Sequence, residues 1–280
     1  MRRKIKEIVS PHAFSYVTYI PRIWRSVKNW IPFVFDYVGL TNKGRVYALR
    51  NGMNIRTGDG MSSGTIAVIF IKKDYGEPPP PNAVLIDIGA NIGVYALYAC
   101  QSPGVRVYAY EPMPENFSLL KENIARNGLE DRISPYPYAV SGRREKRRLY
   151  LGESPLHSFL PIHESPFHAQ FSPGKISAQK FIEVECIPLD EVFESNGILR
   201  CDLLKIDCEG AEYDILYHLP DPYFSRIREI RLEYHNHLGD TKNTGSALVK
   251  FLGTKGFQVR RIKEGSPYQG DVWLERSSTT

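Results

Sequence analysis

Residues 84–95 read VLIDIGANIGVY, an apolar run that ends in an acid and a glycine turn and then continues in a helical pattern. This order predicts the first strand, the nucleotide-binding loop and the first helix of a doubly wound α/β domain. Gly89 and Gly93 allow the backbone to turn sharply and to approach a ligand closely. Asp87 falls at the carboxyl end of the strand, where such folds bind ligands. The stretch therefore predicts a site for a nucleoside-bearing cofactor.

A second acid follows the next strand pattern, Arg106–Tyr110. Glu111 comes about 20 residues after the glycine turn, the distance at which an acid reaches the ribose hydroxyls of a cofactor. The loop lacks the third glycine of the G-x-G-x-x-G pattern, so it offers no evident cradle for a pyrophosphate. The acid at Asp87 favours a cationic ligand such as S-adenosylmethionine over a nicotinamide dinucleotide.

Strand and helix patterns alternate after residue 84. This alternation predicts an α/β fold with a doubly wound, seven-stranded, mostly parallel sheet and helices on both faces. The expected strands are 84–90, 105–110, 133–140, 202–207 and 227–235, with helices at 93–101, 114–127, 211–218 and 244–255 and an antiparallel pair at 257–262 and 269–274.

The segment 142–200 interrupts this alternation. Its strand patterns lie at 146–151 and 181–187, and a helix at 190–195 is expected to have Asp190 as its cap. The stretch 153–175 between the two strands contains four prolines and three histidines without clear periodicity. We interpret it either as a substrate lid or as a surface loop.

The N-terminal part of the chain has a different character. Residues 1–50 contain 10 Lys and Arg against 2 Asp and Glu. Apolar residues recur at helical spacing with basic residues opposite, which predicts a basic amphipathic helix; they are Ile20, Ile23, Trp24, Val27 and Ile31. This helix either packs its apolar face on the catalytic domain or makes a peripheral membrane contact through residues 1–35.

A β-hairpin with an Asn51-Gly52 turn and a helix at 63–73 are expected next. The proline run after residue 77 places a boundary near residue 80, with an N-terminal subdomain at 1–80 and a cofactor-binding domain at 81–280.

Composition and cysteine usage limit the classes of protein. The chain has 280 residues and 42% hydrophobic content, enough for one large core. Its four cysteines show no C-x-x-C spacing, and no apolar run approaches the roughly 18 residues that span a bilayer. We expect a cytoplasmic protein, either free or held peripherally at the inner membrane surface, and no nucleic-acid partner.

A second motif, LLKIDCEGAE at 203–212, is a buried strand that ends in three closely spaced acids and a lysine, an arrangement that is costly to bury unless it serves a site. Asp207 stands at its carboxyl end, and Glu209 follows. On the next strand Glu233 and His235 alternate with apolar residues and point to one side. We expect these four groups to converge near Asp87. They supply enough oxygen and nitrogen for a divalent ion, but no strong ligand motif supports one, so no metal is expected.

Together these motifs resemble the FkbM family of S-adenosylmethionine-dependent methyltransferases. The matching segments run in order from about Tyr75 to His235, and KIDCEGAE is the most specific of them; they are IDIGANIG at 86–93, Glu111-Pro112, YAVS at 138–141, Leu189-Asp190, KIDCEGAE at 205–212 and LEYH at 232–235. Cys208 stands where the family more often has valine.

The resemblance implies a class I, Rossmann-like methyltransferase that uses S-adenosylmethionine and methylates a hydroxyl group of a sugar, glycolipid or polyketide-like metabolite. It also implies cofactor contacts: the ribose at Glu111, further contacts by position at Tyr75 and Ala139, and the methionine part at Asp87, Gly89, Ala90, Asn91 and Gly93.

Methyl transfer mainly requires that the acceptor oxygen be aligned with the methyl group. An alcohol must also lose its proton, and a base contributes roughly 10²–10⁴-fold. His235, Asp207 and Glu209 are the candidates for this base, with Glu233 beside them, and His235 has an ordinary pKa near neutrality. The rival interpretations are a nicotinamide-dependent oxidoreductase acting on sugars and a catalytically inactive, membrane-associated binding protein.

Overall fold

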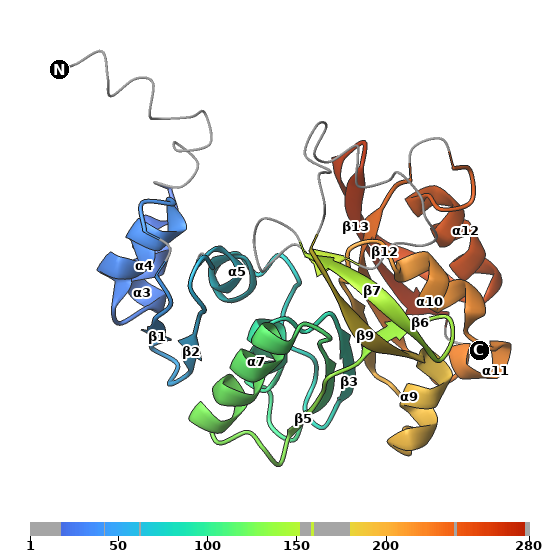
Figure 1. The fold of residues 1–280 in the computed structure, drawn as a ribbon, viewed down its shortest axis with the longest axis horizontal. Coiled ribbons are helices and arrows are strands. Elements are labelled where there is room, and N and C mark those ends of the chain that lie inside the picture. The colour runs from blue at the N-terminus through green and yellow to red at the C-terminus, as the bar shows by residue number, and fades with distance from the viewer. Residues whose placement is uncertain are drawn as a thin grey trace.

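A seven-stranded sheet forms the centre of the computed structural model, which describes residues 18–41, 43–61, 63–151, 158–159, 180–237 and 240–277 (Figure 1). Its strand order is β12-β13-β11-β10-β3-β4-β5. β13 alone runs opposite to the other six strands, so the predicted doubly wound, mostly parallel sheet is confirmed. The strands are β3 (Val84–Ile88), β4 (Arg106–Tyr110), β5 (Ile133–Tyr136), β10 (Leu203–Ile206), β11 (Glu229–His235), β12 (Phe257–Ser266) and β13 (Gln269–Arg276).

Helices cover both faces of this sheet (Figure 1). Successive strand residues point to opposite faces, and the neighbours Leu85 and Ile86 accordingly belong to two different hydrophobic clusters. The Leu85 cluster includes α6 (Val94–Ala99) and α7 (Pro114–Arg126). The Ile86 cluster includes the remaining helices of the domain, which are α9 (Leu189–Ser195), α10 (Glu212–His218), α11 (Asp221–Phe224) and α12 (Gly245–Thr254).

A second sheet, formed by one strand just before the insertion and three strands within it, has the order β6-β9-β7-β8. The strand expected over 133–140 is wrong as one element, because β5 and the next strand belong to different sheets. Pro137 lies between them and has no N–H for a ladder. The expected strands at 146–151 and 181–187 are confirmed. The four strands are β6 (Ala139–Ser141), β7 (Glu145–Leu151), β8 (Ser158–Phe159) and β9 (Phe181–Pro188).

Within the insertion, the expected cap of α9 is wrong and the expected lid or loop is not tested. Asp190 does not cap α9: the helix begins at Leu189 after Pro188, and Asp190 lies in its first turn without a capping bond. The lid or loop expected at 153–175 lies almost wholly outside the described residues.

The N-terminal segment forms two short helices where the sequence predicted one. α3 (Ile20–Ser26) and α4 (Trp30–Tyr37) are separated by Val27, which is extended and pairs with Leu49. Asn29 fixes this break, since its side chain donates to Val46 O at 2.8 Å and accepts from Ala48 N at 3.0 Å. Pro32 is tolerated because it lies in the first turn of α4.

The expected hairpin is confirmed as β1 (Val46–Ala48) and β2 (Asn54–Arg56). The helix expected at 63–73 is present as α5 (Gly64–Ile66) and a π-helix, η1 (Ala67–Lys72). Buried side chains of this N-terminal segment share one hydrophobic cluster with α6 and α7. The boundary near residue 80 stays a prediction. None of the described helices is long and apolar enough to cross a membrane.

Candidate functional site

A cavity of about 320 Å³ opens at the carboxyl ends of β3, β4, β10 and β11. Its walls come from many parts of the chain, among them the glycine turn, β4 and β11, the acids after β10, η1 and the second sheet. η1 contributes Val68 and Ile69, and the second sheet contributes Ala139 and Leu149. The cavity is therefore built by the whole fold, and both the N-terminal segment and the insertion help to enclose it.

The glycine turn is shaped by its neighbours. Gly89 has a φ of +75°, and a Cβ there would lie 1.9 Å from the backbone oxygen of Asp207. Gly93 has a φ of +86°, and a Cβ there would lie 2.5 Å from Leu120 Cδ1. Both positions require glycine, because the close approach of β10 and α7 leaves no space for a side chain.

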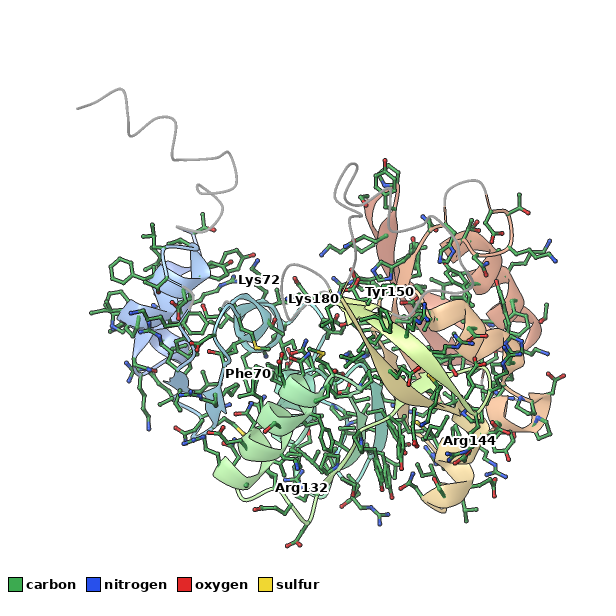
Figure 2. All side chains as sticks on the ribbon, in the orientation of Figure 1. Phe70, Lys72, Arg132, Arg144, Tyr150 and Lys180 are labelled. Atoms are coloured by element: carbon green, nitrogen blue, oxygen red, sulfur yellow. The ribbon has the colours of Figure 1, made fainter. Side chains whose placement is uncertain are left out.

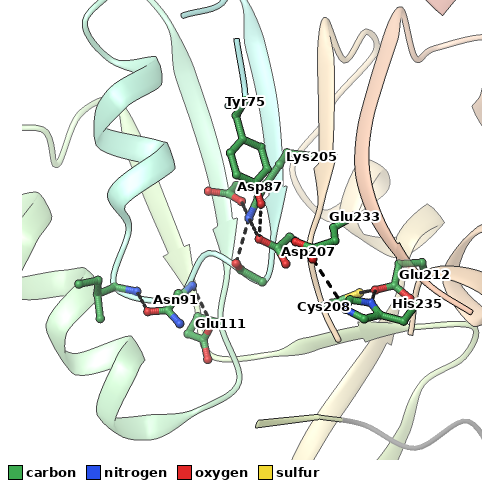
Figure 3. Close-up of polar contacts among 12 residues, drawn as sticks. Tyr75, Asp87, Asn91, Glu111, Lys205, Asp207, Cys208, Glu212, Glu233 and His235 are labelled. Carbon is green, nitrogen blue, oxygen red and sulfur yellow. Dashed lines mark hydrogen bonds and ion pairs between the residues drawn. The ribbon is translucent and has the colours of Figure 1, made fainter. Parts of the chain in front are cut away.

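Glu111 holds the turn from β4. One carboxylate oxygen accepts from Asn91 N at 2.8 Å and the other from Met113 N at 2.9 Å, as Figure 3 shows for Asn91. Burial raises the pKa of Glu111 to about 7, although the two backbone hydrogen bonds by themselves would lower it. Asn91 itself has a φ of +52°, a strained backbone of the kind that collects at ligand sites. Glu111 and Asn91 both line the cavity.

Asp87 pairs with Lys205, which the sequence analysis noted in the buried strand but did not include among the site residues. Asp87 is fully buried and lies behind the cavity wall, with Oδ1 at 3.0 Å from Lys205 Nζ. Lys205 also donates to Gly89 O at 3.1 Å and lies 3.5 Å from Asp207 Oδ2, so it joins three parts of the site (Figure 3). Burial alone would lower its pKa, but the charges of Asp87 and Asp207 outweigh burial and raise it. The signal in the sequence was a lysine inside an otherwise buried apolar strand.

Tyr75 closes the cavity from the N-terminal side. Its hydroxyl donates to Asp207 Oδ2 at 2.8 Å, and burial together with the charge of Asp207 raises the pKa of Tyr75 well above its ordinary value. Arg231 donates to the backbone oxygen of Tyr75 and lies over the ring of Trp273. These contacts connect the segment before β3 to the strands β11 and β13.

The four titratable groups expected to converge do so, and Glu212 joins them. His235 is 4% exposed, and its Nε2 lies 3.5 Å from Glu209 Oε2 and 4.0 Å from Glu233 Oε1. On the other side, Glu212 Oε1 lies 3.1 Å from His235 Nδ1. Glu209, Glu233 and Asp207 line the cavity, whereas His235 and Glu212 lie behind it.

Charge coupling sets the protonation of this cluster. Burial would lower the pKa of His235, but Glu212, Glu209 and Glu233 outweigh it and raise the pKa to about 10. Burial is the main cause that raises the pKa of Glu209 to about 7 and, with the charge of Asp207, that of Glu233 to about 8. A raised pKa favours the protonated form of His235, and a protonated imidazole cannot accept a proton.

The cavity residues fit S-adenosylmethionine. The aromatic rings of Tyr110 and Tyr138 in the cavity wall suit the flat base of a nucleoside. Glu111 supplies a carboxylate that can accept hydrogen bonds from the ribose hydroxyls. At the other end of the cavity, three carboxylates and one lysine line the wall. This excess of negative charge suits the positively charged ammonium and sulfonium groups of the cofactor. Gly93 and Asp87, both predicted cofactor contacts, lie outside the lining. Among the described residues, no group of three or more His, Cys, Asp and Glu side chains is placed to hold a metal ion.

Comparisons with known proteins agree with this chemistry. A family model described as "Methyltransferase FkbM domain" matches residues 87–259. The chain is 30% identical to the 31-O-demethyl-FK506 methyltransferase FkbM of Streptomyces tacrolimicus, over 64% of this chain and 74% of that protein. It is 32% identical to the hexuronic acid methyltransferase AglP of Haloferax volcanii, over 48% of each chain.

Two further proteins either match this chain over a small share of their own length or are less similar in sequence. The chain is 32% identical to the AMB antimetabolite synthetase AmbE of Pseudomonas aeruginosa over 68% of its own length, and it spans 10% of that protein. The crystal structure of Methanocaldococcus jannaschii Trm5 in complex with adenosine matches 84% of this chain and 56% of that chain, with a TM-score of 0.45 and 13% identity. Because the family model covers more than half of the chain, the protein belongs to the FkbM family of S-adenosylmethionine-dependent methyltransferases.

Proposed function

We propose that the protein transfers a methyl group to a hydroxyl of a neutral, polyhydroxylated small molecule, namely a sugar, a glycolipid or a polyketide-like metabolite. The observation that carries this proposal is the row of three carboxylates, Asp207, Glu209 and Glu233, along one end of the cavity. Carboxylates accept hydrogen bonds from hydroxyl groups and can take their protons. The family favours methyl transfer over the oxidoreductase and the inactive binding protein that the sequence left open.

The relatives support a hydroxylated acceptor. The name of the Streptomyces enzyme places its methyl group on an oxygen of FK506, and the Haloferax enzyme is named for a hexuronic acid. A hexuronic acid offers both hydroxyls and a carboxylate. A carboxylate acceptor would bring another negative charge next to three acids and would need no base to lose a proton. The acids of this chain therefore favour a hydroxyl as the methylated group.

Glu111 would hold the cofactor by accepting hydrogen bonds from its ribose, while the backbone of Ala90 and Asn91 lies beside it. Asp207, oriented by Tyr75 and Lys205, would pair with the ammonium group. When bound, S-adenosylmethionine supplies an electrophilic methyl group. The remaining task of the protein is to align the acceptor oxygen and to exclude water.

The acceptor proton passes to Glu209 or Glu233 in this proposal. Their pKa values of about 7 and about 8 lie near neutrality, where a general base works best. His235 acts as a fixed cation behind them, and it stabilises the ionised carboxylate that must form. Glu209 has a φ of +54°, which directs its side chain toward the cavity from the turn after β10.

Methyl-labelled S-adenosylmethionine tests the proposal. The enzyme is incubated with a neutral hexoside, a glycolipid and a hexuronic acid, and S-adenosylhomocysteine and the labelled products are measured by mass spectrometry. An ether that survives mild alkali supports transfer to a hydroxyl. Only alkali-labile products would show esterification and contradict it. Titration calorimetry with S-adenosylmethionine and with NAD is done beforehand. We expect binding of S-adenosylmethionine alone.

A further inference from the structure

α4 is apolar on both of its sides. Its inner side buries Phe33 and Tyr37 in the core. Its outer side exposes Ile31, Phe35 and Val38, which are 53%, 48% and 39% exposed. Residues at i, i+4 and i+7 lie on one helical face, so these three side chains form a continuous outer stripe. A helix that is apolar all round is normally covered on both sides.

The segments on either side of α4 also expose apolar side chains. Trp24 on α3 is 52% exposed, and Leu40 just after α4 is 65% exposed. Half of the large exposed apolar side chains among the described residues thus fall within the short span 24–40. Such concentration distinguishes an interaction surface from the scattered exposed apolar residues of any soluble protein.

The exposed charged side chains within the described part of residues 18–45 are all basic. Arg22, Arg25 and Lys28 of the α3 segment are exposed. The single acid between residues 18 and 45 is Asp36, which is fully buried and pairs with Arg45 at 3.2 Å. The preceding residues 1–17 add four basic residues and one acid to the sequence. A partner of this surface must therefore tolerate apolar contact and carry negative charge.

The outer stripe is not needed to hold the helices in place. Ile23, Val27 and Phe33 are fully buried on the inner side. Ser63 Oγ donates to Phe33 O at 2.9 Å, and the Val27–Leu49 bridge fixes the turn between the helices. Figure 2 shows the side chains of α3 and α4 projecting outward on the side away from the main sheet. Substitutions on the outer side should leave the fold intact.

We propose that the outer stripe of α4 and the basic residues of α3 dock the enzyme on an anionic lipid surface. An aromatic and aliphatic face next to exposed cations is the composition of helices that lie in the membrane interface. Tryptophan is enriched at this depth, and each cation near an anionic surface strengthens binding about fivefold. Because the contact uses the side of the N-terminal helices away from the core, it leaves the cavity residues untouched.

Vesicle sedimentation of the full chain tests the proposal. The wild-type protein should sediment with vesicles of phosphatidylcholine and phosphatidylserine, should bind pure phosphatidylcholine far less, and should be released by high salt. The triple variant Ile31→Gln, Phe35→Gln, Val38→Gln should lose at least about tenfold in binding. Replacing Arg22, Arg25 and Lys28 by Gln should lose about 100-fold.

The matched control is Leu199→Gln, which removes another exposed apolar side chain, 82% exposed, outside this surface. It should bind vesicles like the wild type, and thermal melts should show that all variants are folded. Three results would overturn the proposal: no wild-type binding to anionic vesicles, unchanged binding of the triple variant, or a dimer of the wild-type protein in ultracentrifugation that the triple variant loses. The last result would assign the stripe to a second copy of the chain.

Discussion

Glu212 Oε1 lies 3.1 Å from His235 Nδ1, and both side chains are buried. Glu212 also accepts from the backbone N–H of Gly210 at 3.0 Å, so its position is fixed from two sides. The first residue of α10 is thereby linked to the last residue of β11. This pair raises the pKa of His235 and so favours an imidazolium behind the carboxylates of the cavity.

Glu212→Gln should remove the main charge that holds the His235 proton. We expect the pKa of His235 to fall from about 10 toward its ordinary value, because only Glu209 and Glu233 then oppose the effect of burial. The free energy of unfolding should fall by about 1–3 kcal/mol. NMR of the imidazole nitrogens as a function of pH measures the pKa. Glu194→Gln, which removes an exposed partner of Arg226, is the control and should change neither quantity.

Stability should decrease in alkaline solution for the same reason. The pKa of His235 is about 10 in the folded protein and 6.5 without its partners. A raised histidine pKa stabilises the fold fully below pH 6.5, and this contribution is lost as the pH rises through about 10. The melting temperature of the wild type should therefore fall over that window. In Glu212→Gln the fall should be smaller; an equal fall in both proteins would assign the effect to other groups.

Glu209→Gln and Glu233→Gln should separate the base from its neighbour. The variant that lacks the base should lose about 10²–10⁴-fold in kcat, whereas the other should chiefly raise KM. In the wild type, kcat/KM should rise with pH through about 7 to 8, as the carboxyls ionise. Steady-state kinetics across this range measures both effects. A profile with no ascending limb would remove both glutamates from the role of base.

Asp87→Asn should affect folding as well as cofactor binding. It leaves Lys205, buried and charged, with Asp207 at 3.5 Å and the neutral Gly89 O at 3.1 Å, and breaking a buried ion pair costs about 3 kcal/mol or more. Chemical denaturation measures this loss. Glu122→Gln breaks an exposed i,i+4 pair with Arg126 and should cost less than about 0.5 kcal/mol. Equal losses in the two variants would show that the Lys205 pair contributes little.

Glu111→Gln should weaken S-adenosylmethionine binding by about tenfold or more, because a carboxylate accepts hydrogen bonds from hydroxyls more strongly than an amide does. The amide also cannot accept from both Asn91 and Met113 at once. Calorimetry measures the affinity. Glu115→Gln, in the first turn of α7, is the control and should bind the cofactor like the wild type. Unchanged affinity in Glu111→Gln would remove Glu111 from the ribose site.

Local sequence determined the order of strands and helices, the glycine turn and the family. These features can be predicted from short apolar runs that end in an acid or a glycine, because each pattern extends over only a few residues. The positions of Glu111 at the end of β4 and of Glu209 after β10 also follow from strand ends meeting at one edge of a parallel sheet. Their presence in the cavity needed no knowledge of side-chain packing.

Tertiary structure decided what these residues pair with. The Asp87–Lys205 pair joins adjacent strands that lie far apart in the sequence, and the charge of His235 depends on Glu212 from another element. Val27 likewise left its helical pattern because Leu49 pairs with its backbone. Each result reflects an interaction between groups brought together only by folding. Such interactions depend on distance and burial, and neither quantity is encoded in local periodicity.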